Sequence, residues 1–361
     1  MVASMAPGRS AKPTGHVDMT PESLIFPGTA NGLPLGLGGA PLGNLFEPVG
    51  TAQVADLLGA ALSDGCSSFD TAPHYGQGLS EHRMGQYLRD RNRSSFSIST
   101  KVGRILRPDP AALAEQNGYV QCLPFNQHWD FSTLGIRRSV EDSLQRLGLA
   151  RLDTVFVHDC DALTHGERYP LILQQVLQQT LPTLHQLRRE GYLRHIGLGV
   201  NDVQVCLDVI RQAPDDVTSD CLLLAGRYSL IDHSALAELL PLCVARGIRV
   251  ALGGVFNSGI LATGVRSGGT ARFNYAAASA EWIRRVGAVE AVCERFDVPL
   301  RAAALQFVLA HPAIEVVVLG ARQASEWQDA VHMLRQPLPQ AFWLALRDAG
   351  LLPQDVPIPK A

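Results

Sequence analysis

Four ionisable side chains stand where a purely structural segment would not need them. Asp70 ends one short apolar run of the sequence, and Lys101 and His158 end two later ones. Tyr75 follows Asp70 by five residues, within a stretch that contains Pro, His and Gly. If the three runs are neighbouring strands, their ends bring these side chains to one edge of a sheet. The sequence therefore predicts a cluster of four residues, Asp70, Tyr75, Lys101 and His158, here called the tetrad.

The tetrad has the composition of a proton-transfer site. A free tyrosine has a pKa of about 10, which is too high for proton transfer near neutral pH. A buried ammonium group beside the ring stabilises the phenolate and lowers that pKa, so Lys101 is the candidate that tunes Tyr75. Asp70 would keep the ammonium charged and oriented, and His158 would hydrogen-bond the reacting oxygen or share its proton with Tyr75. This predicts acid/base chemistry at a carbonyl or hydroxyl group, with no protein nucleophile.

Each member of the tetrad also has a structural explanation when it is taken alone. Asp70 could close a strand end, Lys101 could be exposed in a loop, and His158 could bond only to backbone. Tyr75 could pack with its hydroxyl in water. Four separate coincidences at strand ends are harder to explain than one shared site, because perturbed ionisable groups cluster at catalytic sites.

No metal site is predicted. His74 and His82 flank Tyr75 without the i, i+4 spacing of a helical zinc pair, and the segment HDCD (158–161) contains a single histidine. The cysteines do not form the paired spacing that structural zinc requires.

Short apolar runs alternate with amphipathic segments along the chain. The runs are rich in β-branched residues and several are continuously apolar, which is typical of parallel strands covered on both faces. There are eight such runs, at residues 33–39, 67–70, 96–101, 152–158, 193–200, 219–225, 248–254 and 314–320. An eightfold alternation of strand and helix predicts an α/β fold, a (β/α)₈ TIM barrel in a single domain. A doubly wound fold is less consistent, because GLGGAPLGN (36–44) lacks the G-x-G-x-x-G spacing.

The predicted helices have recognisable ends. Thr51 is a candidate N-cap for a helix that stops at Gly65, and Ser132 or Thr133 for one that stops at Gly148. Further helical patterns cover residues 171–190, 202–213, 235–246, 280–296 and 325–334. In a (β/α)₈ barrel the active site lies at the carboxyl ends of the strands, which is where the tetrad is predicted.

Composition limits the partners of the protein. The 361 residues carry a formal net charge of −3 without a Lys/Arg cluster, which argues against nucleic acid or an anionic membrane surface as a partner. No stretch approaches the roughly 18 apolar residues of a membrane span. Seven scattered cysteines indicate reduced thiols and a cytoplasmic protein. Residues 1–30 are predicted to be a loose leader, 31–350 the barrel and 351–361 a C-terminal tail; oligomeric state is not readable.

Three segments resemble the aldo/keto reductase superfamily: FDTAPHYGQGLSEHRMGQYL (69–88), STKVGRIL (99–106) and VFVHD (155–159). The resemblance extends from about residue 30 to about residue 345. It implies that Tyr75 is the general acid/base, that Lys101 and Asp70 tune it, and that His158 orients the substrate oxygen. It also implies NAD(P)(H) bound across the barrel mouth without a Rossmann domain.

Further segments are similar to one branch of this superfamily, the aldose 1-dehydrogenases. These segments are LGLGGAPLGNLF (35–46), SVEDSLQRLG (139–148), IGLGVND (196–202), LAGRYSLID (224–232) and FNSGIL (256–261). The resemblance implies oxidation of the C1 hydroxyl of an aldose of the L-fucose, L-galactose or D-arabinose type to its lactone.

The resemblance also assigns cofactor-binding positions. It implies that Asn201 holds the carboxamide and that Ser258, Gly259 and Leu261 lie at the pyrophosphate. The segment LGARQASEWQDA (319–330) matches the part that grips the adenosine end, where Gly320 precedes a helix N-terminus that suits a phosphate.

The chain departs from the superfamily pattern at several of these positions. Ala225 and Gly253 stand near the places of the carboxamide glutamine and the nicotinamide-stacking tyrosine, and Glu326 and Ala330 replace a glutamine and an asparagine near the adenosine. Arg322 could pair with a 2′-phosphate, whereas Glu326 would repel one. The cofactor is therefore NAD(P), with a lean towards NAD.

Other functions remain open at this point. The same site could work in reverse as an aldehyde or ketone reductase, or the barrel could bind nicotinamide as a non-catalytic scaffold. A Schiff-base aldolase built on Lys101 is disfavoured by Asp70 and Tyr75, which indicate a charged lysine. The long connection 104–132 predicts a lid or binding loop for a small-molecule sugar or carbonyl substrate, with Trp129, Phe131 and Tyr119 as candidate stacking or packing residues.

Overall fold

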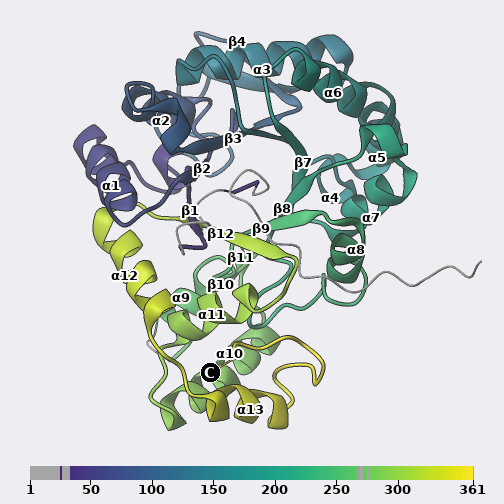
Figure 1. Ribbon diagram of the computed structural model, residues 1–361. Helices are drawn as coiled ribbons and strands as arrows, with labels where there is room; N and C mark the ends of the chain where they lie inside the picture. Colours follow the sequence, from purple (N-terminus) through teal and green to yellow (C-terminus); the bar gives the residue numbers. More distant parts are fainter. Residues whose placement is uncertain (1–24, 27–32, 267, 269–270, 275, 361) are drawn as a thin grey trace, which may run out of the picture.

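A closed barrel of eight parallel strands forms the centre of the molecule (Figure 1). The structure, a computed structural model, describes residues 25–26, 33–266, 268, 271–274 and 276–360. Around the barrel the strands follow in the order β1 (Leu35–Gly38), β12 (Ile314–Gly320), β9 (Arg249–Gly253), β8 (Cys221–Ala225), β7 (His195–Val200), β6 (Thr154–His158), β3 (Ser97–Val102) and β2 (Ser68–Asp70). Each strand falls within or overlaps one of the eight predicted runs, so the barrel prediction is confirmed.

Helices surround the barrel and cover the outer faces of its strands (Figure 1). They are α1 (Thr51–Ser63), α2 (Leu79–Leu88), α3 (Thr133–Leu147), α4 (Ala162–His165), α5 (Tyr169–Gln175), α6 (Leu181–Arg189), α7 (Val203–Gln212), α8 (Leu239–Arg246), α9 (Ile260–Thr263), α10 (Ala280–Arg295), α11 (Leu300–Leu309), α12 (Ala324–Arg335) and α13 (Gln340–Asp348). The sequence patterns did not indicate α2, α11 and α13, nor the short α4 and α9. The helix α11 is buried on most of its surface, which removes the amphipathic period by which helices are recognised.

Both ends of α3 follow the prediction, as does the end of α1, where Gly65 is left-handed with φ 94°; the start of α1 does not. The Ser132 side chain accepts a hydrogen bond from the Gly135 N–H at 3.2 Å, and Gly148 adopts the left-handed conformation, φ 66°, that ends α3. In α1 the N-cap is Gly50 without a side-chain bond, so the expected Thr51 cap is wrong. Thr51 is already inside the helix, where its hydroxyl cannot fill the capping position.

Two predicted helices have different bounds in the structure. The segment 171–190 is interrupted by a π-helix, Val176–Thr180, because Pro182 has no N–H and cannot continue the regular ladder. The helix expected at 235–246 starts only at Leu239. Before it, Asp232 accepts bonds from the N–H and the hydroxyl of Ser234, which holds this segment in a turn.

The predicted binding loop 104–132 begins and ends with an antiparallel hairpin of β4 (Arg104–Pro108) and β5 (Phe125–Trp129). Its tip crosses to the segment that follows β1, where the Phe46 N–H donates to the Gly118 carbonyl at 2.8 Å. The Val120 N–H donates to the Asn44 carbonyl at 3.1 Å. The connection is therefore an ordered element that bridges from β3 to the loop after β1.

The amino-terminal end of the barrel is filled by Ile25 and Phe26. Both are buried, and they pack with the interior residues Phe156, Cys221, Leu223, Ala251, Val316 and Val318. The Phe26 N–H donates to Glu315 Oε1 at 2.7 Å, and Arg249 Nε pairs with the other oxygen at 2.7 Å. The expected loose leader thus does not include residues 25 and 26; its other residues up to 30 lie outside the described part of the chain. In the predicted tail, Leu352 and Val356 are buried.

None of the helices in the described part of the chain is long and apolar enough to cross a membrane.

Candidate active site

Strand ends bring Asp70 and Lys101 together as a buried ion pair. Neighbouring strands β2 and β3 align Asp70 with Ser99, so the Lys101 side chain reaches across to the end of β2. Lys101 Nζ donates to Asp70 Oδ2 at 2.7 Å and to the Thr71 carbonyl at 2.8 Å, and the Ser99 hydroxyl donates to Asp70 Oδ1 at 2.7 Å. The two charged side chains are only 3% and 5% exposed, and these bonds compensate the loss of water.

Tyr75 lies directly beside this pair. Lys101 Nζ is 4.7 Å from the centroid of the Tyr75 ring. The loop that carries Tyr75 packs tightly against the turn after β1: a Cβ on Gly43 would lie 2.5 Å from the Tyr75 carbonyl carbon. This close backbone approach requires glycine and holds the phenol in place over the barrel mouth.

His158 completes the cluster at the end of β6. Its ring is perpendicular to that of Tyr75, with centroids 6.4 Å apart and an interplanar angle of 88°. Burial, and then the charges of Arg104 and Lys101, hold the pKa of His158 well below its ordinary value of 6.5, so the imidazole is neutral. Its buried Nδ1 has no hydrogen-bond partner within the described ranges. The structure thus brings all four members of the tetrad to one place.

A second charged group at this site was not anticipated from the sequence. Arg104, at the start of β4, pairs with Asp159 at 2.5 Å and donates to Gln127 Oε1 at 3.0 Å. His74 Nδ1 lies 3.0 Å from the same Gln127 oxygen. The only sequence signals were the arginine that ends STKVGR and the first acid of HDCD, and neither type is unusual in a loop.

Burial also affects His74. It lowers the pKa of His74 to about 3, with the Arg104 charge as the next cause, so this histidine is neutral as well. Two ion pairs place charge at the tetrad, Lys101 with Asp70 and Arg104 with Asp159.

Tyr119, from the tip of the β4–β5 connection, covers the tetrad. Its ring is stacked on Tyr75, with centroids 6.0 Å apart and an interplanar angle of 26°, and it meets His74 edge-on at 5.2 Å. It is 3% exposed. Tyr119 thus forms a wall beside the phenol, and the binding of substrate by this loop stays a prediction.

The two other aromatic candidates lie deeper in the same hairpin. Trp129 is half-buried and stacks between the Arg104 guanidinium, 3.9 Å from its ring centroid, and Phe131, at 5.7 Å. Phe131 is 2% exposed and packs under Trp129 and beside His165. Phe131 is therefore a packing residue beside the hairpin, whereas Trp129 is partly accessible.

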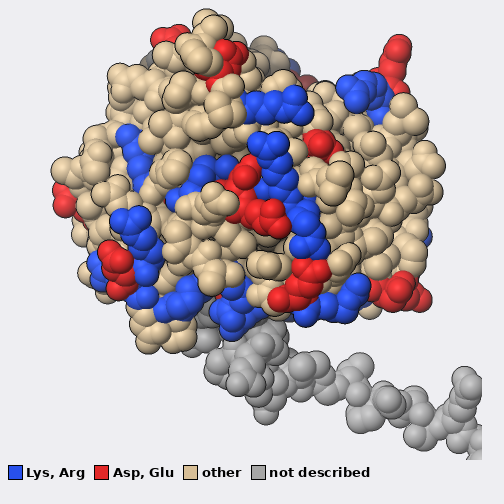
Figure 2. All heavy atoms as spheres, turned by 90° about the horizontal axis from the view of Figure 1, so that it is seen from above, with Lys and Arg blue, Asp and Glu red and all other residues tan. Residues whose placement is uncertain are grey.

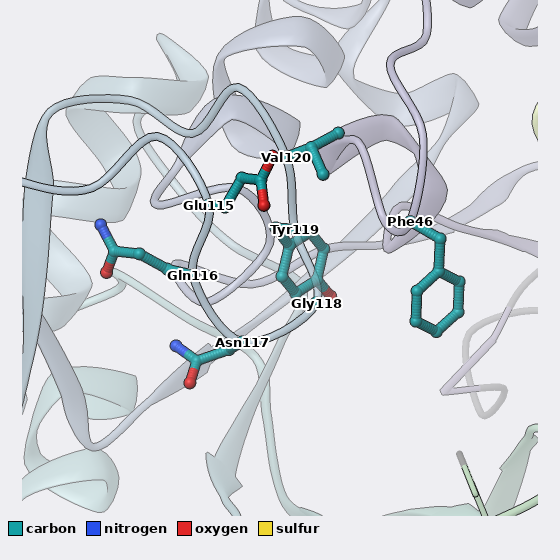
Figure 3. A pocket seen from close by; sticks show the side chains of 7 residues that line it. All are labelled: Phe46, Glu115, Gln116, Asn117, Gly118, Tyr119 and Val120. Atoms are coloured by element: carbon teal, nitrogen blue, oxygen red, sulfur yellow. The ribbon is translucent and has the colours of Figure 1, made fainter.

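A cavity of about 300 Å³ opens on the outer side of this wall (Figure 3). It lies between the loop 115–120 and Phe46, whose ring is 54% exposed. Tyr119 lines this cavity and also stacks on Tyr75, so this one side chain connects the cavity lining to the tetrad.

The predicted carboxamide and pyrophosphate positions cluster at the ends of β7, β8 and β9. Asn201, Ala225 and Ser258 line one small cavity, together with Leu163, Gly226, Arg227, Gly254, Asn257 and Asn274. Ser258 and Gly259 have positive φ, 59° and 96°, in the turn before α9. Leu261 is fully buried at that helix and its N–H donates to the Phe256 carbonyl at 3.1 Å, so this residue is not accessible to a ligand.

This cavity suits a nicotinamide dinucleotide. Asn257 is 2% exposed, and its side-chain oxygen has no hydrogen-bond partner among the residues that the structure describes. The small side chain of Ala225 and the lack of one at Gly253 leave room where a stacking ring would otherwise stand. A buried amide oxygen with free hydrogen-bonding capacity matches the carboxamide of such a cofactor.

The positions assigned to the adenosine end meet at the surface between β12 and α12. Gly320 ends β12 against the Pro41 ring, and the Arg322 N–H donates to Glu326 Oε2 at 2.7 Å. The Arg322 guanidinium pairs with Glu47, a carboxylate from the segment after β1 that the sequence did not single out. Arg322 is thus flanked by two carboxylates, and one N–H expected to face a phosphate is already bonded.

Among the described residues, no group of three or more His, Cys, Asp or Glu could hold a metal ion.

The structure is a (β/α)₈ barrel with Asp, Tyr, Lys and His gathered at its mouth. A cavity that suits a nicotinamide dinucleotide lies beside them, and together these features define a class of barrel oxidoreductases. The chain belongs to the aldo/keto reductase family, whose model matches residues 34–350. It is an NAD(P)-dependent oxidoreductase that acts on a CH–OH group.

Similar characterised proteins come from the aldose dehydrogenase branch. The pyridoxal 4-dehydrogenase of Microbacterium luteolum is 40% identical over 328 residues, which cover 88% of this chain and 94% of the relative. The D-threo-aldose 1-dehydrogenase of a Pseudomonas species is 35% identical over 325 residues, with the same coverage of both chains. The L-galactose dehydrogenase of Arabidopsis thaliana is 29% identical and covers 82% of each chain.

Solved structures share the fold. An aldo-keto reductase of Bacillus halodurans superposes with a TM-score of 0.65 at 22% identity, over 90% of this chain and 93% of that one. An aldo/keto reductase of Klebsiella pneumoniae, solved with NADP and acetate, has a TM-score of 0.62 at 19% identity, over 89% and 92% of the two chains.

Proposed function

We propose that the protein oxidises the C1 hydroxyl of an aldose, or of a similar cyclic hemiacetal, to the lactone. The observation that carries the proposal is the contact of a buried, charged Lys101 with the ring of Tyr75 at the barrel mouth. It is supported by the likeness to relatives named for an aldose and for pyridoxal, an aldehyde that closes to an internal hemiacetal.

In this proposal the tetrad moves one proton. Tyr75, as a phenolate stabilised by the Lys101 ammonium, takes the proton of the C1 hydroxyl. Asp70 keeps the ammonium charged and in place, and neutral His158 hydrogen-bonds the reacting oxygen. The nicotinamide, when bound, supplies the hydride acceptor at C1. The half-buried Trp129 is the aromatic surface proposed to face the sugar, whereas Tyr119 packs beside Tyr75.

The substrate class is tested by a spectrophotometric screen with NAD⁺ and NADP⁺. We expect cofactor reduction with L-fucose, L-galactose or D-arabinose, and pyridoxal is included because the relative with 40% identity is named for it. Open-chain alcohols are the control, since they lack the hemiacetal hydroxyl. Turnover of alcohols without turnover of any cyclic hemiacetal would contradict the proposal.

The reductive direction is a second use of the same site. Initial rates with NADH and NADPH over a panel of aldehydes separate it from the first, because the tetrad itself can work in either direction. Faster reduction of an aldehyde than oxidation of every sugar would favour an aldehyde or ketone reductase.

For the cofactor we propose a preference for NAD over NADP. Asn201, Ser258, Gly259 and Gly320 are the positions proposed to hold it. A 2′-phosphate at the adenosine end would have to compete with Glu47 for the Arg322 guanidinium and would lie close to Glu326. A free 2′-hydroxyl meets no such repulsion and can donate to a carboxylate.

The double variant Glu47→Gln/Glu326→Gln is expected to lose most of this preference. Each exposed carboxylate contributes up to about 1 kcal/mol, so the ratio of kcat/KM for NAD⁺ to that for NADP⁺ should fall roughly tenfold. Steady-state kinetics with both cofactors measure it, and Glu238→Gln, which removes an exposed partner of Arg211, is the control. An unchanged ratio would show that these carboxylates do not select the cofactor.

A cytoplasmic location and a small-molecule substrate complete the proposal. All seven cysteines are free thiols and six of them are buried, which is consistent with a reducing compartment. On the face shown in Figure 2, basic and acidic side chains are interspersed, which gives no single-sign surface for a nucleic acid.

A further inference from the structure

A carboxylate at the barrel mouth lies between a guanidinium and the imidazole of the tetrad. Asp159 Oδ2 is 2.5 Å from Arg104 Nη2 and 3.4 Å from His158 Nε2. The side chains of Arg104 and Asp159 are only 13% and 19% exposed. Water screens this ion pair little, because both side chains are mostly buried. The pair also contacts the proposed reaction site directly, through His158.

Several elements hold this pair in one geometry. The Arg104 guanidinium stacks on Trp129 and donates to Gln127, both from β5. Asp159 has a left-handed backbone, φ 42°, and its N–H donates to the Gly199 carbonyl of β7 at 3.0 Å. A left-handed residue other than glycine is uncommon, and it persists where the surroundings determine it, as at functional sites.

We propose that Arg104 and Asp159 are a positioning pair for the reaction: Asp159 fixes the orientation of the His158 ring, and Arg104 offsets the Asp159 charge so that the imidazole stays neutral. This inference rests on the proposed function, in which His158 hydrogen-bonds the substrate oxygen in its neutral form. The carboxylate alone would orient the ring but would also favour the imidazolium, so the guanidinium is needed with it.

The ionisable groups that face His158 come from each element packed around it: His74 and Tyr75 after β2, Lys101 on β3, Arg104 on β4 and Asp159 after β6. Lys101 and Arg104 are cations, and Asp159 is the carboxylate next to the ring. The net positive charge around His158 therefore disfavours the imidazolium, as burial does. Removing Arg104 changes this balance by one cation and leaves the adjacent carboxylate uncompensated.

Single and double variants separate this role from a structural one. Removing Arg104 and removing Asp159 should change the protonation of His158 in opposite directions, whereas two structural losses would not. In Arg104→Gln the pKa of His158 should rise, because Asp159 is then uncompensated, although burial and Lys101 still lower it. In Asp159→Asn the ring should stay neutral even more strongly. In the double variant both charges are absent, so the neutral ring should be restored while its orientation is lost.

The test is a ¹⁵N NMR titration of protein labelled at histidine, between pH 5 and 8, with His158→Asn to assign the resonance. We expect no titration of His158 in the wild type or in Asp159→Asn, and titration in Arg104→Gln. The pH profile of kcat/KM is measured with the substrate found in the screen. For Arg104→Gln, kcat/KM should fall about tenfold for each pH unit on the acid side of this profile. Asp159→Asn and the double variant should lower kcat without this limb.

Arg93→Gln is the matched control. Arg93 pairs with Asp153 at 2.5 Å, also with little exposure of the carboxylate, but at the opposite ends of β3 and β6. It should lower the free energy of unfolding without affecting the His158 titration or the pH profile. If Arg104→Gln behaves like Arg93→Gln in both measurements, the pair is structural and the inference is overturned.

The NMR titration needs no substrate, so the two proposals fail separately. Titration of His158 only in Arg104→Gln, together with no turnover of any hemiacetal, would contradict the proposed function and leave the charge balance at His158 established. Turnover of a sugar with an unaltered His158 titration in Arg104→Gln would contradict the inference alone.

Discussion

Replacing Tyr75 with phenylalanine is expected to lower kcat for the oxidation roughly 10²–10⁴-fold, because the substrate hydroxyl then has no group to accept its proton. The phenylalanine ring keeps the packing against Tyr119 and the Lys101 ammonium, so the protein should fold as before. Cofactor binding, measured by the quenching of tryptophan fluorescence, should be unchanged, which locates the loss in the chemical step.

The control for this variant is Tyr192→Phe. Tyr192 is a partly exposed phenol in the connection between α6 and β7, away from the tetrad, and its hydroxyl should be dispensable for turnover. If Tyr75→Phe kept kcat within about threefold of the wild type, another group would be the base, and the proposed mechanism would be wrong.

Replacing Lys101 with methionine is expected to have the second large effect, on the pH dependence. An opposite charge this close favours the phenolate by about one to three pH units, so the rising limb of kcat for oxidation should move up by that amount. At neutral pH kcat should fall about 10–10³-fold and recover as the pH is raised towards 10. The pH profile of kcat measures both.

The same variant should be less stable. Asp70 would remain buried with no cation, and breaking a buried ion pair from one side costs about 3–5 kcal/mol. Urea denaturation measures this loss. The double variant Asp70→Asn/Lys101→Met removes both charges and should regain stability while keeping the shifted pH profile, so the kinetic test does not depend on a marginally folded protein.

Arg146→Met is the matched control for Lys101→Met. Arg146 pairs at 2.5 Å with Glu81, whose side chain is fully buried behind β3, outside the barrel mouth. Its loss should cost similar stability and leave the pH profile unchanged. An upward shift of the profile in both variants would mean that destabilisation, rather than the ammonium, produces the effect.

The sequence predicted the barrel strands and the site residues that lie at the ends of those strands. All eight barrel strands and the confluence of Asp70, Lys101 and His158 could be predicted, because parallel strands are buried on both faces and barrel sites occur at their carboxyl ends. Helix bounds could be predicted where a polar cap and an apolar period coincide, as at Ser132 and α3. The helix α11 was not predicted, because most of its surface is buried and it lacks that period.

The family likeness, too, was readable from the sequence, since it is carried by local segments. The hairpin β4–β5 was not, because its strands are only half-buried and lack a continuous apolar run. A long connection indicated a binding loop, but which of its aromatic side chains faces the tetrad depended on how the hairpin folds back over Tyr75.

Only the tertiary structure decided which charges meet at the site. Arg104 and Asp159 are 55 positions apart, and Glu47 and Arg322 are 275 apart, in segments whose paths no local pattern describes. Periodicity reports whether a residue is buried, and residue type reports what chemistry it can do. Neither reports which of many charged loop residues will be neighbours, because that depends on the closure of the barrel, which brings the last strand beside the first.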